Sequence, residues 1–117
     1  MSAHNEKLVI KPWGNEKIWA KTDKYVGKLM TIRAGKRMSL QYHEKKEETI
    51  YVLSGCLMLW TEKSDENCLI LNPGETYHVK PGCVHRFGAD HTQDVVLIEV
   101  STPELDDVIR LEDDYGR

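Results

Sequence analysis

Glycine and proline turn signals divide most of this sequence into short segments, and their spacing limits the fold more than any other feature. The turns are marked by Ala34-Gly35, Ser54-Gly55, Asn72-Pro73-Gly74 and Pro81-Gly82, and the segments between them are rich in β-branched or alternating apolar residues. Turns at intervals of about eight to twelve residues are typical of an all-β sandwich or barrel. We therefore expect an all-β fold, a small antiparallel β-barrel of the jelly-roll type.

Eight strands are predicted from these segments. They cover Lys28–Arg33, Met38–His43, Thr49–Leu53, Leu57–Thr61, Cys68–Leu71, Thr76–Val79, His85–Phe87 and Val95–Ser101. The middle of the sequence lacks helical periodicity, and only the segment after Pro103 has apolar residues at helical spacing. We expect an N-terminal tail over residues 1–10, a single domain over residues 11–117, and a short C-terminal tail that is helical or extended.

The charge balance limits the classes of partner. Sixteen Lys and Arg residues against nineteen Asp and Glu residues give a net charge of −3, which argues against a dedicated nucleic-acid-binding protein. The longest uncharged stretch, residues 49–61, is too short to span a bilayer, and the N-terminus lacks the apolar run of a signal peptide. Three cysteines without a C-x-x-C pair indicate reduced thiols. We therefore expect a cytoplasmic protein that binds neither nucleic acids nor membranes.

Charge is unevenly distributed along the chain. Residues 1–37 carry nine basic and three acidic side chains, whereas residues 38–117 carry seven basic and sixteen acidic ones. A solvated first strand and an acidic tail account for this asymmetry, and a basic patch for an anionic ligand is the alternative.

Polar residues with metal-binding side chains occupy two of the predicted strands. Because side chains alternate between the faces of a strand, Gln41 and His43 share one face. Glu48 begins the next strand and shares its face with Ile50 and Val52, so its carboxylate points inward and needs a cation or a hydrogen-bond partner. His85 follows the Pro81-Gly82 turn and could approach from the opposite wall. His43 alone would be read as an ordinary surface histidine, but the four together indicate a metal site.

An amide oxygen, two imidazoles and a carboxylate form a ligand set of intermediate softness. Such a set suits Zn, Mn, Fe, Co or Ni better than a thiolate-loving ion, and it does not resemble a calcium loop. We expect one divalent metal ion, with Zn preferred. An ion held in this way could act as a Lewis acid on a substrate that carries a hydroxyl beside a carbonyl group.

The spacing of these residues resembles the two motifs of the cupin superfamily. The first motif, G-x5-H-x-H-x3,4-E-x6-G, matches Gly35 to Gly55, with Gln41 in place of the first histidine. The second motif, G-x5-P-x-G-x2-H-x3-N, matches Gly74 to Ala89, with Lys80 in the proline position and Ala89 in the asparagine position. This resemblance implies a cupin barrel and a metal bound by Gln41, His43, Glu48 and His85.

Longer stretches resemble the C-terminal cupin domain of type II phosphomannose isomerases. The chain has Lys-Pro-Trp-Gly at residues 11–14, Ala-Gly-Lys-Arg-Met-Ser-Leu-Gln-Tyr-His at 34–43, and Asp-Asp-Val-Ile-Arg-Leu-Glu-Asp-Asp-Tyr-Gly-Arg at 106–117. A glutamine in the first ligand position is typical of this branch. The nucleotidyltransferase domain that often precedes this domain has no room in 117 residues, so we expect a stand-alone cupin domain.

This resemblance implies that the protein interconverts mannose 6-phosphate and fructose 6-phosphate. The reaction moves a proton between C1 and C2, and it needs an electrophile for the oxygens, a base, and cations for the phosphate. We expect Arg37, Lys46 and Arg110 to bind the sugar phosphate, with Lys46 on a loop at the barrel mouth. The base is not identified, and Glu44, Glu47 and His78 are open candidates.

Two other functions remain open alternatives. One is a non-catalytic cupin module that binds a sugar or an anion, which is favoured because Glu44 to Glu47 lack the His/Arg-rich composition usual in the family. The other is an Fe-dependent oxygenase or lyase, which the glutamine in the ligand set weakly disfavours.

In each case we expect a homodimer, because edge strands of this fold usually pair between subunits.

Overall fold

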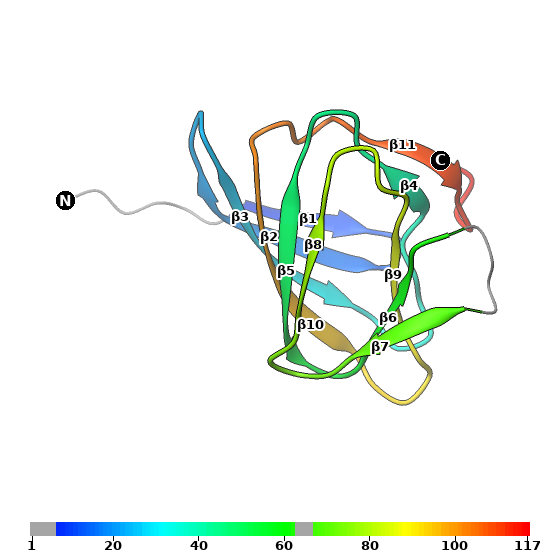
Figure 1. Ribbon diagram of the computed structural model, residues 1–117. Coiled ribbons are helices and arrows are strands. Elements are labelled where there is room, and N and C mark those ends of the chain that lie inside the picture. The colour runs from blue at the N-terminus through cyan, green and yellow to red at the C-terminus, as the bar shows by residue number, and fades with distance from the viewer. Residues whose placement is uncertain (1–6, 63–66) are drawn as a thin grey trace.

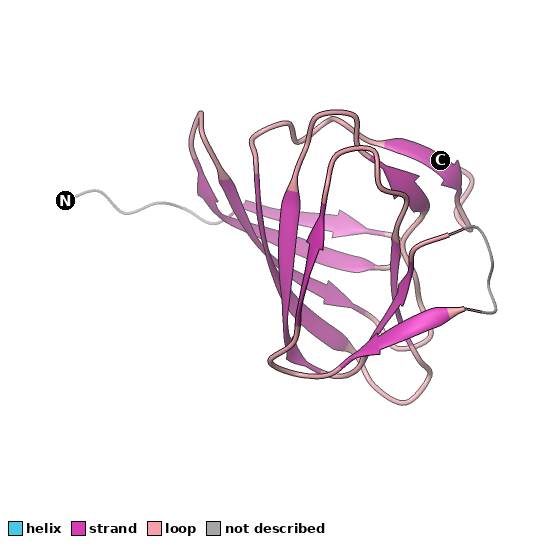
Figure 2. Ribbon diagram, in the orientation of Figure 1, coloured by secondary structure: helices cyan, strands magenta, loops and turns pink. Residues whose placement is uncertain are grey.

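The computed structural model describes residues 7–62 and 67–117, which form eleven β-strands and no helix (Figures 1 and 2). The strands are β1 (Lys7–Lys11), β2 (Gly14–Lys21), β3 (Val26–Ile32), β4 (Leu40–Tyr42), β5 (Glu48–Ser54), β6 (Leu57–Trp60), β7 (Cys68–Leu71), β8 (Thr76–Val79), β9 (Arg86–Ala89), β10 (Val95–Ser101) and β11 (Ile109–Glu112). These residues therefore contain no helix long and apolar enough to cross a membrane.

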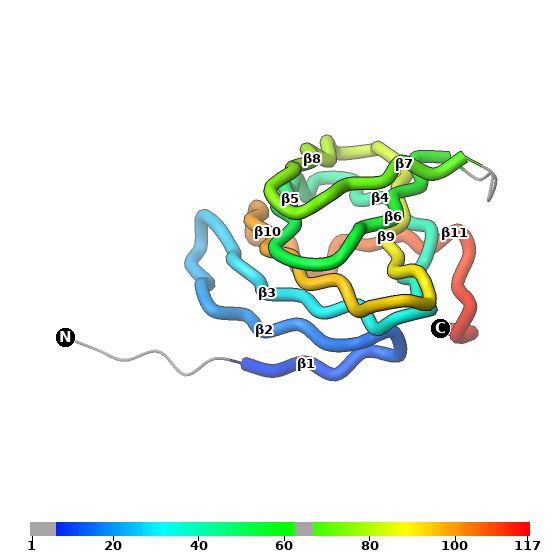
Figure 3. Tube along the Cα trace, turned by 90° about the horizontal axis from the view of Figure 1, so that it is seen from below, coloured from blue at the N-terminus to red at the C-terminus, as the bar shows by residue number. Residues whose placement is uncertain are grey.

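The strands form two layers that curve around one interior (Figure 3). One layer is a six-stranded antiparallel sheet with the order β1-β2-β3-β10-β5-β8. The other contains the three-stranded sheet β7-β6-β9 and the pair β11-β4, which single bridges between Gln41 and His85 and between Arg37 and Gly88 join into a common wall. The predicted small antiparallel barrel of the jelly-roll type is thereby confirmed.

Apolar side chains from the inward faces of both layers pack together inside the barrel. Met30, Ile50 and Leu97 of the six-stranded sheet contact the same buried cluster as Leu59 and Phe87 of the opposite layer. On β5 the inward residues are buried and alternate with Tyr51 and Leu53, which are exposed. This alternation is the period-2 pattern of a strand with one buried face.

Each of the eight predicted strands overlaps a strand of the structure, and β1, β2 and β11 are additional. Residues 7–10, which the sequence places in the N-terminal tail, belong to β1 and pair with β2 from Lys7↔Ile18 to Lys11↔Gly14. Residues 1–6 of that tail lie outside the described residues. The C-terminal tail is extended, since β11 pairs with β4, and it contains no helix among residues 102–117.

Candidate metal-binding site

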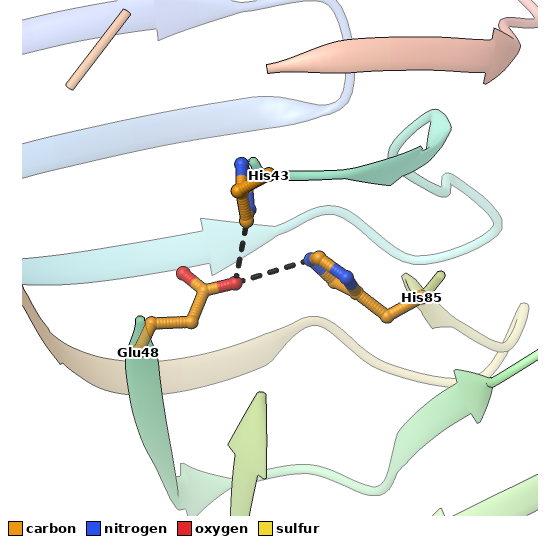
Figure 4. A group of neighbouring side chains, drawn as sticks. All are labelled: His43, Glu48 and His85. Atoms are coloured by element: carbon orange, nitrogen blue, oxygen red, sulfur yellow. Dashed lines mark ion pairs between the residues drawn. The ribbon is translucent and has the colours of Figure 1, made fainter. Parts of the chain in front are cut away.

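Three buried side chains converge on one point inside the barrel (Figure 4). His43 follows β4, Glu48 is the first residue of β5, and His85 directly precedes β9. Glu48 Oε1 lies 3.3 Å from His43 Nε2 and 3.1 Å from His85 Nε2. One potential ligand atom from each residue lies within 4.8 Å of the other two, so a single ion could contact all three.

The hydrogen bonds of the two histidine rings suit metal ligation. His43 Nδ1 lies 2.5 Å from the carbonyl oxygen of Asp107, and His85 Nδ1 lies 3.0 Å from that of Cys83. A carbonyl oxygen can only accept, so each Nδ1 is the donor and the Nε2 of a neutral ring carries a lone pair. Metal-ligating histidines are held by the same kind of outer hydrogen bond.

Both Nε2 atoms are buried, and neither has a hydrogen-bond partner among the described residues. Leaving a buried polar atom unpaired is costly, typically about 1–3 kcal/mol, and a metal ion between the rings would remove that cost. Two imidazole nitrogens and a carboxylate oxygen also match the preferences of Zn and similar divalent ions. The residues present therefore fit a divalent metal.

Gln41, the predicted fourth ligand, is buried beside this cluster and lines the same cavity. Its backbone pairs with that of His85 through N–H···O contacts of 3.0 and 2.9 Å, which fixes the two residues side by side. Its side-chain oxygen accepts a hydrogen bond of 2.6 Å from Ser39 Oγ. The structure thus brings Gln41, His43, Glu48 and His85 together, and their role as ligands stays a prediction.

A chain of buried charges extends from Glu48 into the six-stranded sheet. Lys46 Nζ lies 3.2 Å from Glu48 Oε2 and 3.2 Å from Glu99 Oε2. Lys28 Nζ lies 3.2 Å from Glu16 and 3.9 Å from Glu99. Each of the two buried ammonium groups lies between two carboxyl groups, which gives these buried charges the partners that they require.

The surroundings of Glu48 and Glu99 shift the pKa values of these two carboxyl groups in opposite directions. Burial raises the pKa of Glu99, and the charge of Glu48 raises it further, to about 8. Burial would also raise the pKa of Glu48, but contacts with Glu99, His43 and His85 hold it well below its usual range. Burial opposes the charge of Lys46, whereas Glu99 and Glu48 together raise its pKa above the ordinary value. Glu48 is therefore the ionised carboxylate, as a metal ligand must be.

Two members of the cluster, His43 and Glu48, line a cavity of about 220 Å³, and His85 contacts Glu48 beside it. Two of the predicted sugar-phosphate contacts line it: Lys46, which is buried inside rather than placed on an exposed loop, and Arg110, which is exposed on β11. Arg110 is the register partner of Gln41 across the β11–β4 pair. Both therefore line the same cavity as His43 and Glu48, and their contact with a substrate stays a prediction.

Arg37, the third predicted phosphate contact, does not line this cavity. Its guanidinium donates to both carboxylate oxygens of Asp114, over 2.6 and 3.0 Å, and it lies over the ring of Trp60. Alternation predicts that Arg37 shares a face with Gln41 and His43, but regular strand geometry begins only at Leu40. The structure therefore does not bring Arg37 to the other predicted site residues.

The three open candidates for the base lie outside the cavity. Glu44 is exposed, and Glu47 pairs with His78 on the outer surface, where the His78 Nε2–Glu47 Oε2 distance is 2.5 Å. The residues that sequence reasoning missed are Glu99 and Lys28, which are buried in the cavity wall. Each is a charged residue on the otherwise apolar inward face of a strand, which is the signal that identified Glu48.

The chain matches known proteins over almost its whole length. The family model described as mannose-6-phosphate isomerase C-terminal matches residues 1–113. The alginate biosynthesis protein AlgA of Pseudomonas aeruginosa is 30% identical over 116 residues, covering 97% of this chain and 24% of AlgA. The mannose-1-phosphate guanylyltransferase ManC of Salmonella typhimurium is 29% identical over 117 residues, also 97% of this chain and 24% of ManC.

These curated relatives are much longer proteins, and the chain spans about a quarter of their length.

Among solved structures, the polyketide cyclase RemF of Streptomyces resistomycificus superposes with a TM-score of 0.80 at 20% identity, covering 95% of this chain and 84% of RemF. At this identity the likeness concerns the fold alone.

Proposed function

The chain belongs to the mannose-6-phosphate isomerase C-terminal family, and from this membership we propose that it interconverts mannose 6-phosphate and fructose 6-phosphate in the cavity lined by His43 and Glu48, beside His85. The observation that carries the proposal is the pair of buried Nε2 atoms that face one carboxylate oxygen and have no hydrogen-bond partner among the described residues. Such a cluster is expensive to bury unless it serves a ligand or an ion.

We propose that His43, Glu48 and His85 hold one divalent metal ion, with the Gln41 amide oxygen beside them. When bound, the ion would supply Lewis-acid polarisation of the hydroxyl and carbonyl oxygens at C1 and C2. Zn is the first choice because the donors are two imidazole nitrogens and a carboxylate. Mn, Fe, Co and Ni accept the same donor types and belong in the same test.

The chain itself would orient the sugar and exclude water from the reacting carbons. Met30 and Met38 provide an apolar wall of the cavity, and the buried ammonium groups of Lys28 and Lys46 stand beside carboxylates at its base. These groups are held by their own ion pairs, so they are fixed before a substrate enters. Fixed dipoles and charges of this kind stabilise developing charge without reorganising.

The test is to incubate the purified chain with mannose 6-phosphate and each of the five divalent ions in turn, and to follow the formation of fructose 6-phosphate. We expect turnover with at least one ion and its loss in Glu48→Gln, while His91→Ala, an exposed histidine outside the cavity, retains it. No turnover with any ion, in samples that elemental analysis shows to be loaded, would refute the isomerase function.

A non-catalytic binding module is the second candidate. It is favoured by one observation: Lys46 and Arg37 are engaged by carboxylates of the same chain, so two of the three predicted phosphate contacts have partners already. Binding of mannose 6-phosphate to the metal-loaded protein without any turnover would select this function.

The proposed place of action is the cytoplasm. Cys56, Cys68 and Cys83 are free thiols, which suits a reducing compartment. A sugar phosphate is also found where kinases produce it, and both substrates of the proposed reaction are sugar phosphates.

A further inference from the structure

Strands from the edges of both layers line the cavity. The six-stranded sheet ends at β1, and β11 is the outer strand of the opposite wall. Lys7 and Lys11 of β1 and Arg110 of β11 all line the cavity. We call these three side chains the cationic rim.

On β1 the basic side chains face the cavity and two apolar side chains face outward, which is the opposite of the arrangement in a strand that covers an apolar core. Lys7, Val9 and Lys11 face the cavity, whereas Leu8 is 53% exposed and Ile10 is 72% exposed on the other side of the strand. A strand that only covers a barrel would bury its apolar residues and leave its lysines in water. Solvation alone therefore does not explain why the lysines line the cavity.

Some basic side chains that line the cavity form ion pairs with carboxylates, and others do not. Lys28 lies beside Glu16, Lys46 lies between Glu48 and Glu99, and Arg117 pairs with Asp113 at 3.0 Å. By contrast, no ion pair joins a residue of the cationic rim to any carboxylate within residues 7–62 and 67–117. Asp106 is the one further carboxylate among the described residues that line the cavity, so the three cations of the rim exceed it and leave positive charge in excess on this part of the wall.

We infer that the cationic rim is an anion-binding site that holds the phosphomonoester of a sugar phosphate whose sugar lies at the metal cluster. The inference rests on the proposed function for the position of the sugar. Two flexible ammonium groups from one edge and a planar guanidinium from the other can contact different oxygens of one phosphate dianion. The site also accounts for part of the basic excess of residues 1–37, and it assigns phosphate binding to β1 in place of Arg37.

The test compares the binding of mannose 6-phosphate and mannose to the Zn-loaded protein by titration calorimetry. We expect the wild type to prefer mannose 6-phosphate, and the double variant Lys7→Gln, Lys11→Gln to lose roughly tenfold or more of that affinity, because charge-assisted hydrogen bonds disappear. Binding of mannose should not change. Added salt should weaken the wild type more than the double variant, because screening acts on the charges that were removed.

Two controls make the outcome specific. Lys36→Gln removes an exposed lysine from the turn between β3 and β4, outside the cavity, and should bind like the wild type. Arg110→Gln tests the opposite edge separately and should also weaken mannose 6-phosphate binding. Equal affinity of the wild type for mannose and mannose 6-phosphate, or unchanged affinity in the double variant, would overturn the inference.

The result separates this inference from the proposed isomerase function. Phosphate-dependent binding that needs Lys7 and Lys11, in a protein without turnover, supports the cationic rim and refutes the isomerase. Turnover by a double variant that binds mannose 6-phosphate as well as the wild type does supports the isomerase and refutes the cationic rim.

Discussion

The backbone carbonyl of Asp107 accepts a hydrogen bond from His43 Nδ1, and the two atoms are 2.5 Å apart. The Asp107 carboxylate also accepts from the backbone N–H groups of Glu44, Lys45 and Lys46, over 3.1, 2.7 and 2.9 Å. These backbone hydrogen bonds hold the pKa of Asp107 below its usual range. One residue from the C-terminal segment thus fixes both a candidate ligand and the loop that leads to Glu48.

Replacing Asp107 should therefore weaken metal binding without touching a ligand. In Asp107→Ala the backbone N–H groups of residues 44–46 lose the carboxylate that accepts from them, whereas the backbone carbonyl that accepts from His43 Nδ1 is retained without this anchor. Loss of a direct outer partner typically lowers metal affinity about 10- to 100-fold, and because this partner loses only its anchor we expect the lower end, about tenfold, in a competition titration with a chromogenic chelator. Asp23→Ala, in the β2–β3 turn, is the control. An unchanged affinity in Asp107→Ala would contradict this view of the site.

Removal of a ligand should abolish metal binding and preserve the fold. His85→Ala deletes one of the two unpaired Nε2 atoms, and Gln41→Ala deletes the amide beside it. We expect both variants to lose the metal in elemental analysis after dialysis, while their far-UV circular dichroism stays that of the wild type. Stoichiometric metal in His85→Ala would show that the ligand assignment is wrong.

Lys46 should matter for stability far more than its neighbour does. Lys46→Met leaves Glu48 and Glu99 facing each other without the ammonium between them, and breaking a buried ion pair costs about 3–5 kcal/mol. Lys45→Met changes an exposed side chain of the same loop and should alter the free energy of unfolding by less than about 0.5 kcal/mol. Urea unfolding of the metal-free proteins measures both. Equal stability of the two variants would contradict a structural role for the buried charges.

The Arg37–Asp114 pair should make a small contribution that depends on pH. The hydrogen bond from Arg37 lowers the pKa of Asp114, and the Arg37 charge lowers it further, although burial acts in the opposite direction. A carboxyl group with a depressed folded-state pKa stabilises the fold above its unfolded pKa of about 3.9 and loses that contribution as the pH falls through the folded value. Both side chains are partly exposed, so Asp114→Asn should cost under about 1 kcal/mol at pH 7.

The measurement is urea unfolding of wild type and Asp114→Asn at pH 7 and at successively lower pH. The difference in unfolding free energy should be present at pH 7 and shrink below about pH 4. A difference that grows on acidification would have the wrong sign.

The outer face of the six-stranded sheet should bind a second copy of the chain. Leu8, Leu29, Ile98 and Tyr51 form one line across this face, because Lys17 is the register partner of both Leu8 and Leu29, and Ile98 is the partner of both Leu29 and Tyr51. A two-fold axis parallel to the strands would set β1 and β2 of one copy against β5 and β8 of the other, so that this apolar line is covered along its length.

Light scattering with size-exclusion chromatography tests the homodimer. We expect the mass of a dimer for the wild type and of a monomer for Ile10→Lys, which places a charge on this face. Leu69→Lys is the matched control, because Leu69 is 55% exposed on β7 in the other layer. A monomeric wild type, or dissociation by Leu69→Lys alone, would contradict the proposed face.

The sequence predicts the barrel well where turns and period-2 alternation agree. β5 and β10 lie where their apolar runs predict, and Gly55, which ends the first of them, has φ of 77° and no room for a Cβ beside the Asp94 carbonyl. β1 is missed because Leu8 and Ile10 face outward while Lys7 and Lys11 face the cavity. A reading that assigns polar residues to solvent cannot recognise such a strand.

Some residues of the candidate site can also be predicted from the sequence, and others cannot. Glu48 is identifiable because one charged residue stands on an apolar face, and Glu99 and Lys28 carry that signal too. Arg37 is misplaced because alternation cannot be counted through residues 37–39, which precede the regular strand. The contacts of Asp107 with His43 and its loop join residues far apart in the chain, and no local pattern encodes them.

The position of β10 has a consequence for biosynthesis. β10 lies between β3 and β5 in the sheet, although residues 95–101 are made after both of them. A nascent chain on the ribosome therefore cannot join these two halves until most of it has been translated. Folds dominated by such distant pairings form slowly. We therefore expect the proposed metal to be captured only after translation, and chains that stop before Val95 to be degraded rather than loaded.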